Sequence, residues 1–370
     1  MAIHFDKRVT GINISGIRKM FEGAGPGAIN LGLGQPDFDT PQHIKDAAIR
    51  AICEGFTGYT VNMGVPELRD ALSEKFSNEN GLSYAPSEIM ITAGASEALH
   101  IALQALCGPG DEVLVPDPGF VSYSALAKLA GASPIGVPLG EALKYDPEKL
   151  KDYITKKTRV IVLNSPSNPT GMVQSRKEVK AISEIATDRN ITVISDEVYE
   201  HFIYDGQHHV SPALFSDNVV TVNASSKTYS MTGWRIGYVA ARPEYTEQML
   251  KVHQYVLACA CSISQKASLA AITGPQDSVI VMREEFRRRR DYLIKELKAM
   301  GVPCVTPTGA FYAFPKVGDE EEIVAELLKK GVITTPGTSF GNYGKGYLRI
   351  AYSTSMTNLE RSVAIMKTIF

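Results

Sequence analysis

Six short apolar runs, each closing in a turn, recur through the first 240 residues of the chain. They are EIMIT (88–92), EVLV (112–115), VIVL (160–163), ITVIS (191–195), VVTV (219–222) and IGYVA (236–240). Strands that alternate with helical segments are typical of α/β folds with a largely parallel sheet. Because the runs are apolar throughout rather than alternating, they favour a sheet that helices cover on both faces.

Helix-period segments fill the gaps between most of these runs. SEALHIALQALC ends before the Gly-Pro-Gly stop signal at 108–110, and KEVKAISEIA spaces Val179, Ile182 and Ile185 along one helical face. Beyond about residue 275 the order changes to a long charged helix, an extended piece AFYAFPKV, a helix EEIVAELLKKG, a strand YLRIAYS and a final helix. This change indicates a smaller α+β domain.

We predict three parts along the chain. Residues 1–40 form an N-terminal arm and part of the small domain, because their Gly- and Pro-rich stretch is typical of a crossing between domains. Residues 41–275 form the large domain, and residues 276–370 form the small C-terminal domain.

The charge balance excludes some classes of partner. The 370 residues contain 38 Lys and Arg against 40 Asp and Glu, so no overall field attracts nucleic acid or anionic lipid. A small-molecule partner is therefore expected. The most conspicuous basic run, Arg287–Arg290, lies in a stretch with a helical apolar stripe and predicts a solvated helix face.

Cysteines, histidines and hydrophobic runs bear on location and metals. Five cysteines without CxxC spacing argue against a disulfide framework and a zinc site, and favour a reducing compartment. The N-terminus has no apolar core, and no run of about 18 apolar residues occurs, so we expect a cytoplasmic protein outside the membrane. His201, His208 and His209 read as surface residues, and no metal is expected.

Polar or reactive residues follow five of the six apolar runs. The sequences are TAGAS, PDPGF, NSPSNPTG, DEVY and NASSK, in chain order. Ligands of open α/β sheets bind at the carboxyl ends of the strands. The sequence therefore predicts one ligand pocket along one edge of the sheet.

Two of these segments, and an arginine that follows the last one, suit an anion or a carbonyl carbon. Gly94, Ala95 and Ser96 lead into a helix whose first amides lack internal partners, which indicates an anion site unless Ser96 only caps the helix. A desolvated Lys227 would be a nucleophile toward carbonyls, although a surface lysine fits the same position. Arg235 offers a fork for a phosphate or for an internal salt bridge.

Four more residues stand out by their surroundings. Asp196 ends an apolar strand and needs a cationic or N–H partner, or else caps the next segment, and Tyr199 follows three residues later. Asn168, in a turn with two prolines, suits an anionic ring oxygen or a plain turn. Arg349, inside an apolar strand, needs an anion, either a substrate carboxylate or an internal Asp or Glu.

Four longer motifs occur in a recognisable order. They are NSPSNPTG (164–171), ISDEVY (194–199), SKTYSMTGWRIG (226–237) and YLRIAYS (347–353), with LGLGQPDFDTP, YTVNMGVPELR, TAGASEAL and PGDEVLVPDPGF in support. Together they resemble the class I (and II) aminotransferases of pyridoxal 5'-phosphate (PLP) fold type I, in the subgroup of bacterial and archaeal aspartate and aromatic aminotransferases.

The resemblance implies PLP as cofactor and a role for each matching residue. Lys227 would hold PLP as a Schiff base, and Asp196 would pair with the pyridine nitrogen; with Tyr199 they would be the catalytic residues. The other cofactor ligands would be Asn168 and Tyr199 at the ring oxygen, Phe120 on the ring face, and Ala95, Ser96, Ser226, Arg235 and, from a second subunit, Tyr59 at the phosphate. Gly34, Asn168 and Arg349 would bind the substrate.

The resemblance also implies a fold and a reaction. The fold would have a large domain with a mostly parallel seven-stranded sheet, a small α+β domain from both chain ends, and a homodimer with shared sites. The reaction would move an amino group between an L-amino acid, of aspartate, aromatic or broad type, and a 2-oxo acid, with 2-oxoglutarate expected. A PLP-dependent carbon–sulfur β-lyase is the alternative, and a non-catalytic PLP-binding sensor is a weaker one.

Two positions bear on details of this resemblance. Ala224 stands where the family has Gly or Ser, so Ser225 or Ser226 would have to replace that phosphate ligand. Gln104 matches the position at which some relatives with acidic substrates carry Lys, which weakens an aspartate assignment. Phe340 and Tyr312 leave an aromatic substrate open.

Overall fold

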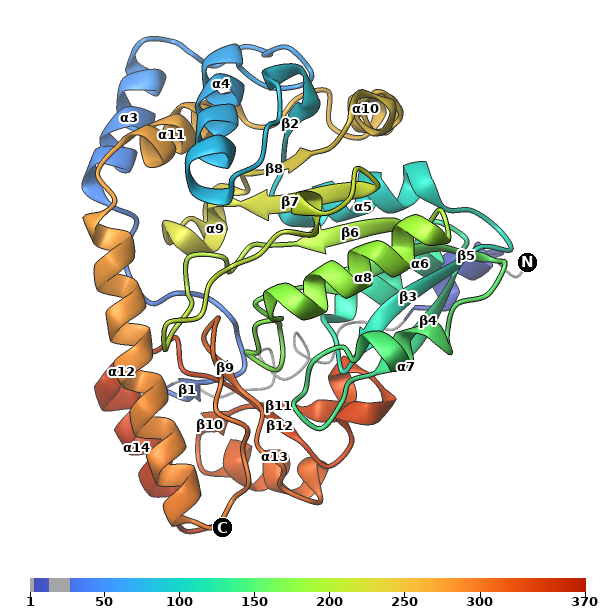
Figure 1. Ribbon diagram of the computed structural model, residues 1–370. Helices are drawn as coiled ribbons and strands as arrows, with labels where there is room; N and C mark the ends of the chain where they lie inside the picture. Colours follow the sequence, from blue (N-terminus) through green and yellow to red (C-terminus); the bar gives the residue numbers. More distant parts are fainter. Residues whose placement is uncertain (1–2, 13–26) are drawn as a thin grey trace.

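A seven-stranded sheet forms the centre of the computed structural model, which describes residues 3–12 and 27–370 (Figure 1). Its strands lie in the order β2-β8-β7-β6-β5-β3-β4. They are β2 (Ile89–Thr92), β3 (Glu112–Asp117), β4 (Ser133–Pro138), β5 (Thr158–Asn164), β6 (Thr192–Asp196), β7 (Val219–Ala224) and β8 (Gly237–Ala240). Only β8 runs antiparallel to its neighbours, β2 and β7. The predicted α/β fold with a mostly parallel sheet is confirmed.

Six of the seven strands coincide with the apolar runs, and β4 is the one without such a run. Its sequence, SPIGVP, contains two prolines and a glycine, and it is half-exposed for most of its length. Because β4 lies at the edge of the sheet and pairs only with β3, prolines that would break a central strand are tolerated there.

Helices cover both faces of this sheet. Side chains on successive strand residues point to opposite faces, and accordingly Val160 and Val162 face one helical layer while Ile161 and Leu163 face the other. The first layer contains α5 (Ala95–Leu106), α6 (Val121–Leu129) and α10 (Pro243–Val256). The second contains α3 (Gln42–Cys53), α4 (Pro66–Lys75), α7 (Pro147–Lys151), α8 (Arg176–Asp188) and α11 (Ser262–Thr273).

A smaller unit joins the two ends of the chain. β1 (Ile29–Asn30) pairs in parallel with β10 (Val332–Ile333), and β11 (Thr335–Pro336), β12 (Leu348–Ala351) and β9 (Tyr312–Ala313) form an antiparallel sheet. Its helices are α13 (Glu320–Lys329) and α14 (Met356–Met366). Both chain ends thus contribute to one unit, while the boundaries at residues 40 and 275 stay a prediction.

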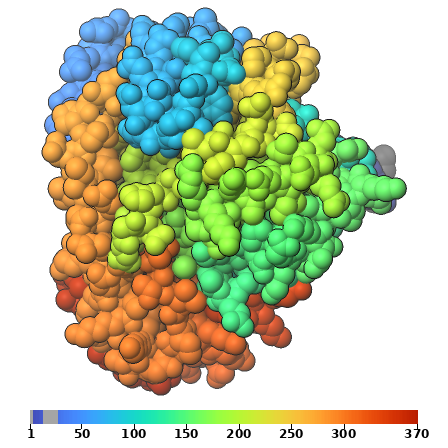
Figure 2. Space-filling view, viewed as in Figure 1, coloured from blue at the N-terminus to red at the C-terminus, as the bar shows by residue number. Residues whose placement is uncertain are grey.

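The long helix α12 (Asp277–Ala299) connects the two units. It runs along one side of the molecule from the N-terminal helices to the C-terminal segment (Figures 1 and 2). Phe286, Leu293 and Leu297 bury its apolar side in the small core. Within the part of the chain that the structure describes, the remaining α-helices are the short α1 (Lys7–Thr10) and α9 (Ser225–Thr228). Within the described ranges, no helix is both long and apolar enough to cross a membrane.

The basic run on α12 departs from the prediction of a solvated face. Arg289 and Arg290 are buried, and their guanidinium groups pair with Asp37 at 2.6 Å and with Asp205 at 2.6 Å. The segments that carry these aspartates cover this part of the helix, which periodicity within α12 could not reveal. The prediction is therefore wrong for half of the run.

A buried ion pair lies beneath the carboxyl end of β6. Lys75, the last residue of α4, donates to the Glu200 carboxylate, and both side chains are almost fully buried. Asn80 and Asn223 donate to the same carboxylate at 2.7 and 2.6 Å. Burial alone would raise the pKa of Glu200, but the Lys75 ammonium lowers it well below its usual range. The pair ties α4 to the chain segments that follow β6 and end β7.

We predict that Lys75→Met destabilises the protein strongly, because it leaves Glu200 charged, buried and without its cation. The expected loss of unfolding free energy is about 3–5 kcal/mol. The matched control is Lys180→Met on α8, whose partner Glu184 is exposed; it should cost about 0–1 kcal/mol. Denaturant titration measures both, and equal losses would contradict the prediction.

Candidate active site

A pocket of about 660 Å³ opens at the carboxyl ends of the parallel strands. Of the six apolar runs, one is not followed by such ligand-type residues, and it forms β8. This strand is antiparallel to its neighbours, so its carboxyl end lies at the opposite edge of the sheet. All predicted site residues except Tyr59 line the pocket: Gly34, Ala95, Ser96, Phe120, Asn168, Asp196, Tyr199, Ser226, Lys227, Arg235 and Arg349. The predicted convergence of strand ends on one pocket agrees with this geometry.

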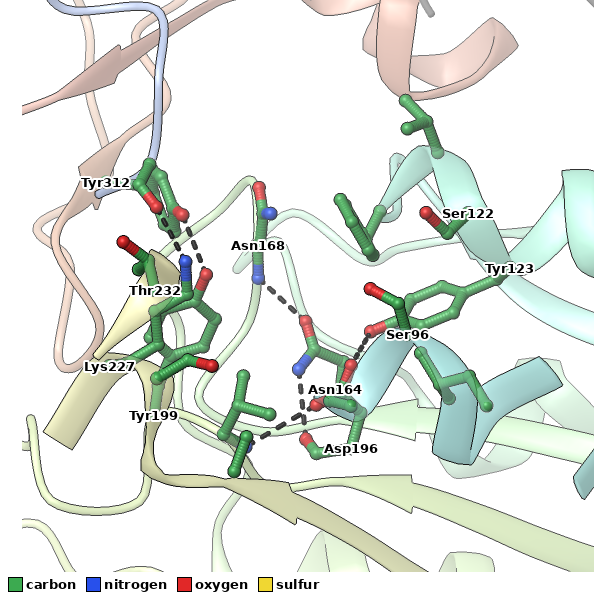
Figure 3. A pocket seen from close by; sticks show the side chains of 18 of the residues that line it. Ser96, Ser122, Tyr123, Asn164, Asn168, Asp196, Tyr199, Lys227, Thr232 and Tyr312 are labelled. Atoms are coloured by element: carbon green, nitrogen blue, oxygen red, sulfur yellow. Dashed lines mark hydrogen bonds between the residues drawn. The ribbon is translucent and has the colours of Figure 1, made fainter. Parts of the chain in front are cut away.

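Lys227 lies on the short helix α9, directly after β7, and points into this pocket (Figure 3). Its ammonium donates to the Gly34 carbonyl oxygen at 2.7 Å. Burial, together with the positive charges of Arg349 and Arg235, lowers the pKa of Lys227 to about 8. A lysine with such a pKa is partly neutral near physiological pH and is a competent nucleophile.

Asp196, the last residue of β6, lies at the floor of the pocket and is 4% exposed (Figure 3). Tyr123 on α6 donates its hydroxyl to the Asp196 carboxylate at 2.7 Å, and the Val198 amide donates at 3.4 Å. Burial raises the pKa of Asp196 to about 6, against the effect of the Tyr123 hydrogen bond. A buried carboxylate of this kind is stabilised by a cationic N–H group.

Arg349, on β12, is 2% exposed and has no carboxylate partner among the described residues. Its Nη1 donates to the Asn168 side-chain oxygen at 2.9 Å and its Nη2 to the Gly32 carbonyl, while Nε has no partner. The Phe340 ring lies 4.7 Å from the guanidinium carbon. No Asp or Glu of the described residues is therefore the partner of Arg349, and an anion from outside these residues fits best.

Arg235 borders the start of α5 and likewise forms no ion pair within the described ranges. Its guanidinium donates to the carbonyl oxygens of Thr232 at 2.9 Å and Ala93 at 3.4 Å. Gly94 has φ +78, and an added Cβ there would lie 2.7 Å from Arg235 Nη2, so only glycine permits this approach. The cap residue of α5 is Gly94, so the interpretation of Ser96 as a plain helix cap is wrong.

The loop before Lys227 resolves the choice between two serines. Ser226 and Ala224 line the pocket, whereas the Ser225 hydroxyl lies 2.8 Å from that of Ser268, outside it. Of the two candidates left open by the sequence, Ser226 is therefore the one placed to replace the ligand expected at 224.

Tyr123 and Asn164 line the pocket but received no role from the sequence. Tyr123 contacts Asp196 as described, and Asn164 donates to the Asp196 carbonyl at 3.0 Å and accepts from the Asn168 amide at 2.8 Å (Figure 3). The Tyr312 hydroxyl lies 2.7 Å from that of Tyr199. Asn164 follows an apolar strand as the other site residues do, so that signal could have identified it; Tyr123 carries no comparable signal.

Two residues named from the sequence lie outside the pocket of this chain. Gln104 lies on α5 but is not among the residues that line the pocket. It is therefore not placed as expected for the residue that matches the lysine of relatives with acidic substrates. Tyr59 is 91% exposed and also lies outside the pocket, so its expected contact needs a second copy of the chain.

His209 is not a plain surface residue as predicted. Its Nε2 lies 2.9 Å from a carboxylate oxygen of the fully buried Glu197, and with Glu200 these groups are close enough together to hold a metal. Protein groups already bind both carboxylates, however, since Ser195 and Ser211 donate to Glu197 and Lys75 donates to Glu200, whereas His209 Nδ1 has no partner among the described residues. His208 is exposed, as expected.

Comparison with known proteins shows similarity over nearly the whole chain. Residues 26–365 match the family described as Aminotransferase class I and II. The probable aspartate aminotransferase of Methanocaldococcus jannaschii is 44% identical over 98% of this chain and 99% of its own length. The aromatic-amino-acid aminotransferase 2 of Thermococcus litoralis is 39% identical over 98% and 97%. The solved aspartate aminotransferase from Thermus thermophilus with maleate gives a TM-score of 0.95 at 37% identity, covering 100% of both chains.

We predict that an amine-reactive reagent labels Lys227 of the protein without added ligand with a midpoint near pH 8, below the 10.5 of an ordinary lysine. Arg235→Gln should raise this midpoint, because the charge of Arg235 lowers the pKa of Lys227. Arg242→Gln removes an exposed arginine paired with Glu244 and should leave it unchanged. Mass spectrometry of the labelled peptide gives the profile; a wild-type midpoint near 10.5 would refute the prediction.

Proposed function

Because the chain belongs to the family of class I and II aminotransferases, we propose that it moves amino groups between L-amino acids and 2-oxo acids with PLP held on Lys227. Aminotransferase activity is common to its named relatives. The observation that carries the residue assignment is the position of Lys227 between the buried Asp196 and two arginines that pair with no carboxylate of the described residues.

The residues of the pocket fit PLP at each of its polar groups. Arg235, the Ser226 hydroxyl and the free first amides of α5 at Ala95 and Ser96 would bind the phosphate. At the floor, Asp196 forms no ion pair with a cation of the described residues and would pair with a protonated ring nitrogen. The remaining contacts would be Asn168 and Tyr199 at the ring oxygen and Phe120 against the ring.

PLP, when bound, supplies an electron sink for the negative charge that forms at the α-carbon of the amino acid. The protein's part is proton transfer and orientation. Lys227, with its pKa near 8, would take the α-proton and return it, and Asp196 would keep the ring nitrogen protonated. Arg349 would hold the substrate carboxylate with its free Nε and fork geometry.

The substrate side chain would meet Leu33, Ser122 and Thr232, which line the same pocket. All three cations that the described residues contribute to the pocket already have roles above, so a second substrate carboxylate would meet hydroxyl and apolar groups. We therefore propose broad donor specificity that includes aromatic amino acids, with 2-oxoglutarate as acceptor. Aspartate remains a candidate donor, as in the name of the Methanocaldococcus relative.

The exposed face around Tyr59 suggests a homodimer. Tyr59, Val61, Tyr255 and Val256 are large apolar side chains, each more than half exposed. Burial of such a face against a second copy would bring Tyr59 to the phosphate of the neighbouring site. The cytoplasmic location, like the dimer, stays a prediction.

The decisive test is a panel of amino donors with 2-oxoglutarate and PLP, followed through glutamate formation. We expect transfer from several donors, aromatic ones included. Lys227→Arg should reduce it by roughly 10²–10⁴-fold and abolish covalent trapping of PLP at position 227 by borohydride. Lys180→Arg, at an exposed lysine, is the control. Ammonia and pyruvate from cystathionine, without glutamate formation, would favour the β-lyase instead.

A subunit-mixing experiment tests Tyr59. Tyr59→Ala and Lys227→Arg homodimers should each be impaired, the first in PLP affinity and the second in activity. In a mixed dimer, the subunit with Lys227 would receive an intact Tyr59 from its neighbour, so one normal site should reappear. A fully active monomer in sedimentation, or no recovery on mixing, would contradict the shared site.

A further inference from the structure

Asp117 is a buried carboxylate for which the roles above provide no use. It ends β3 and is 6% exposed. Burial raises the pKa of its carboxyl group, and only hydrogen bonds from two backbone amides oppose that effect. A carboxylate buried without a cation destabilises a fold unless other contacts compensate.

The partners of Asp117 belong to the other structural unit. Its two carboxylate oxygens accept from the backbone amides of Asn342 at 3.0 Å and Tyr343 at 2.9 Å. Beside them, the Gly119 amide donates to the Phe340 carbonyl at 2.8 Å. The loop after β3 is thus hydrogen-bonded three times to the segment 340–343, which lies between β11 and β12.

Gly341 permits this close approach. Its φ is +134, and a Cβ built there would lie 2.1 Å from Asp117 Oδ1. An L-residue at 341 would therefore be strained and would push the carboxylate away. The segment forms a backbone cradle that fits the Asp117 carboxylate.

One segment leads to a residue of the pocket, and the other contacts Arg349, which also lines the pocket. Phe120 follows the β3 loop and lines the pocket. Phe340 starts the other segment, and its ring lies 4.7 Å from the Arg349 guanidinium carbon. Phe340 also packs edge-on against Phe314, with ring centroids 6.2 Å apart. A shift of the segment would therefore move the aromatic wall that orients Arg349.

We propose that Asp117 is a positioning residue, which holds the segment 340–343 so that Phe340 keeps Arg349 aimed at the substrate carboxylate. The inference rests on the proposed role of Arg349. It assigns to Asp117 an effect on substrate binding that is separate from the binding of PLP.

The main test is Asp117→Asn, which keeps the shape but leaves one oxygen to accept two amides and sets an NH₂ group against the other. The loss of a charged hydrogen bond should raise KM for amino donor and 2-oxoglutarate about tenfold or more. The kcat and the affinity for PLP should stay within roughly threefold. Gly341→Ala, which disturbs the contact from the other side, should have the same selective effect. Asp146→Asn, at a carboxylate that caps α7 outside the pocket, should have none.

A merely structural role would give a different pattern. If Asp117→Asn lowered kcat and PLP affinity as much as it raised KM, or if its effect added fully to that of Phe340→Leu, the proposal would be overturned. Arg349→Lys separates the two levels of inference. If it leaves KM unchanged, the role of Arg349 fails and the role of Asp117 with it; if it raises KM while Asp117→Asn does not, only the role of Asp117 fails.

Discussion

The common direction of six of the seven strands is the constraint on which the pocket depends. Parallel strands bring their carboxyl ends to one edge, where each chain segment leaves the sheet and its backbone groups are free to bind a ligand. Asp196 ends β6 and Lys227 follows β7, and the two residues meet at one edge of the sheet because β6 and β7 pair in parallel. The antiparallel β8 completes the sheet without delivering a side chain directly from its carboxyl end.

The side chains at the end of β6 and just after it point to two different sides of the sheet edge. Asp196 and Tyr199 face the pocket, whereas Glu197 and Glu200 face a buried polar network on the other side. Every charge of that network is paired internally, which fixes the backbone from which Asp196 and Tyr199 project. The buried network thus holds the walls of the pocket in place. Removal of any single charge from it would destabilise the fold, because the partner charge would stay buried and unpaired.

Charges in the pocket follow the opposite pattern. Arg349 and Arg235 donate to carbonyl or amide oxygens, and no carboxylate among the described residues neutralises either one. Together with burial, their uncompensated charge lowers the pKa of Lys227, and it is available to bound anions. The charges of the buried network are paired with each other and support the backbone. The arginines of the pocket lack a carboxylate partner among the described residues, which suits them to bind a ligand.

The sequence by itself determined six of the seven strands of the central sheet, the fold class and eleven of the residues that line the pocket, because strand propensity and the residues that follow each strand are local features. Sequence reasoning failed where a role depends on a distant partner. The sequence predicted that Arg289 and Arg290 are solvated, but they are buried and pair with Asp37 and Asp205. It also associated Gln104 with the substrate, but this residue does not line the pocket. Tyr123, the ion pair of Lys75 and the contact of Asp117 with the segment 340–343 were decided by the tertiary structure alone. Their partners are between 73 and 226 positions away in the chain, and no local pattern encodes a contact at that separation.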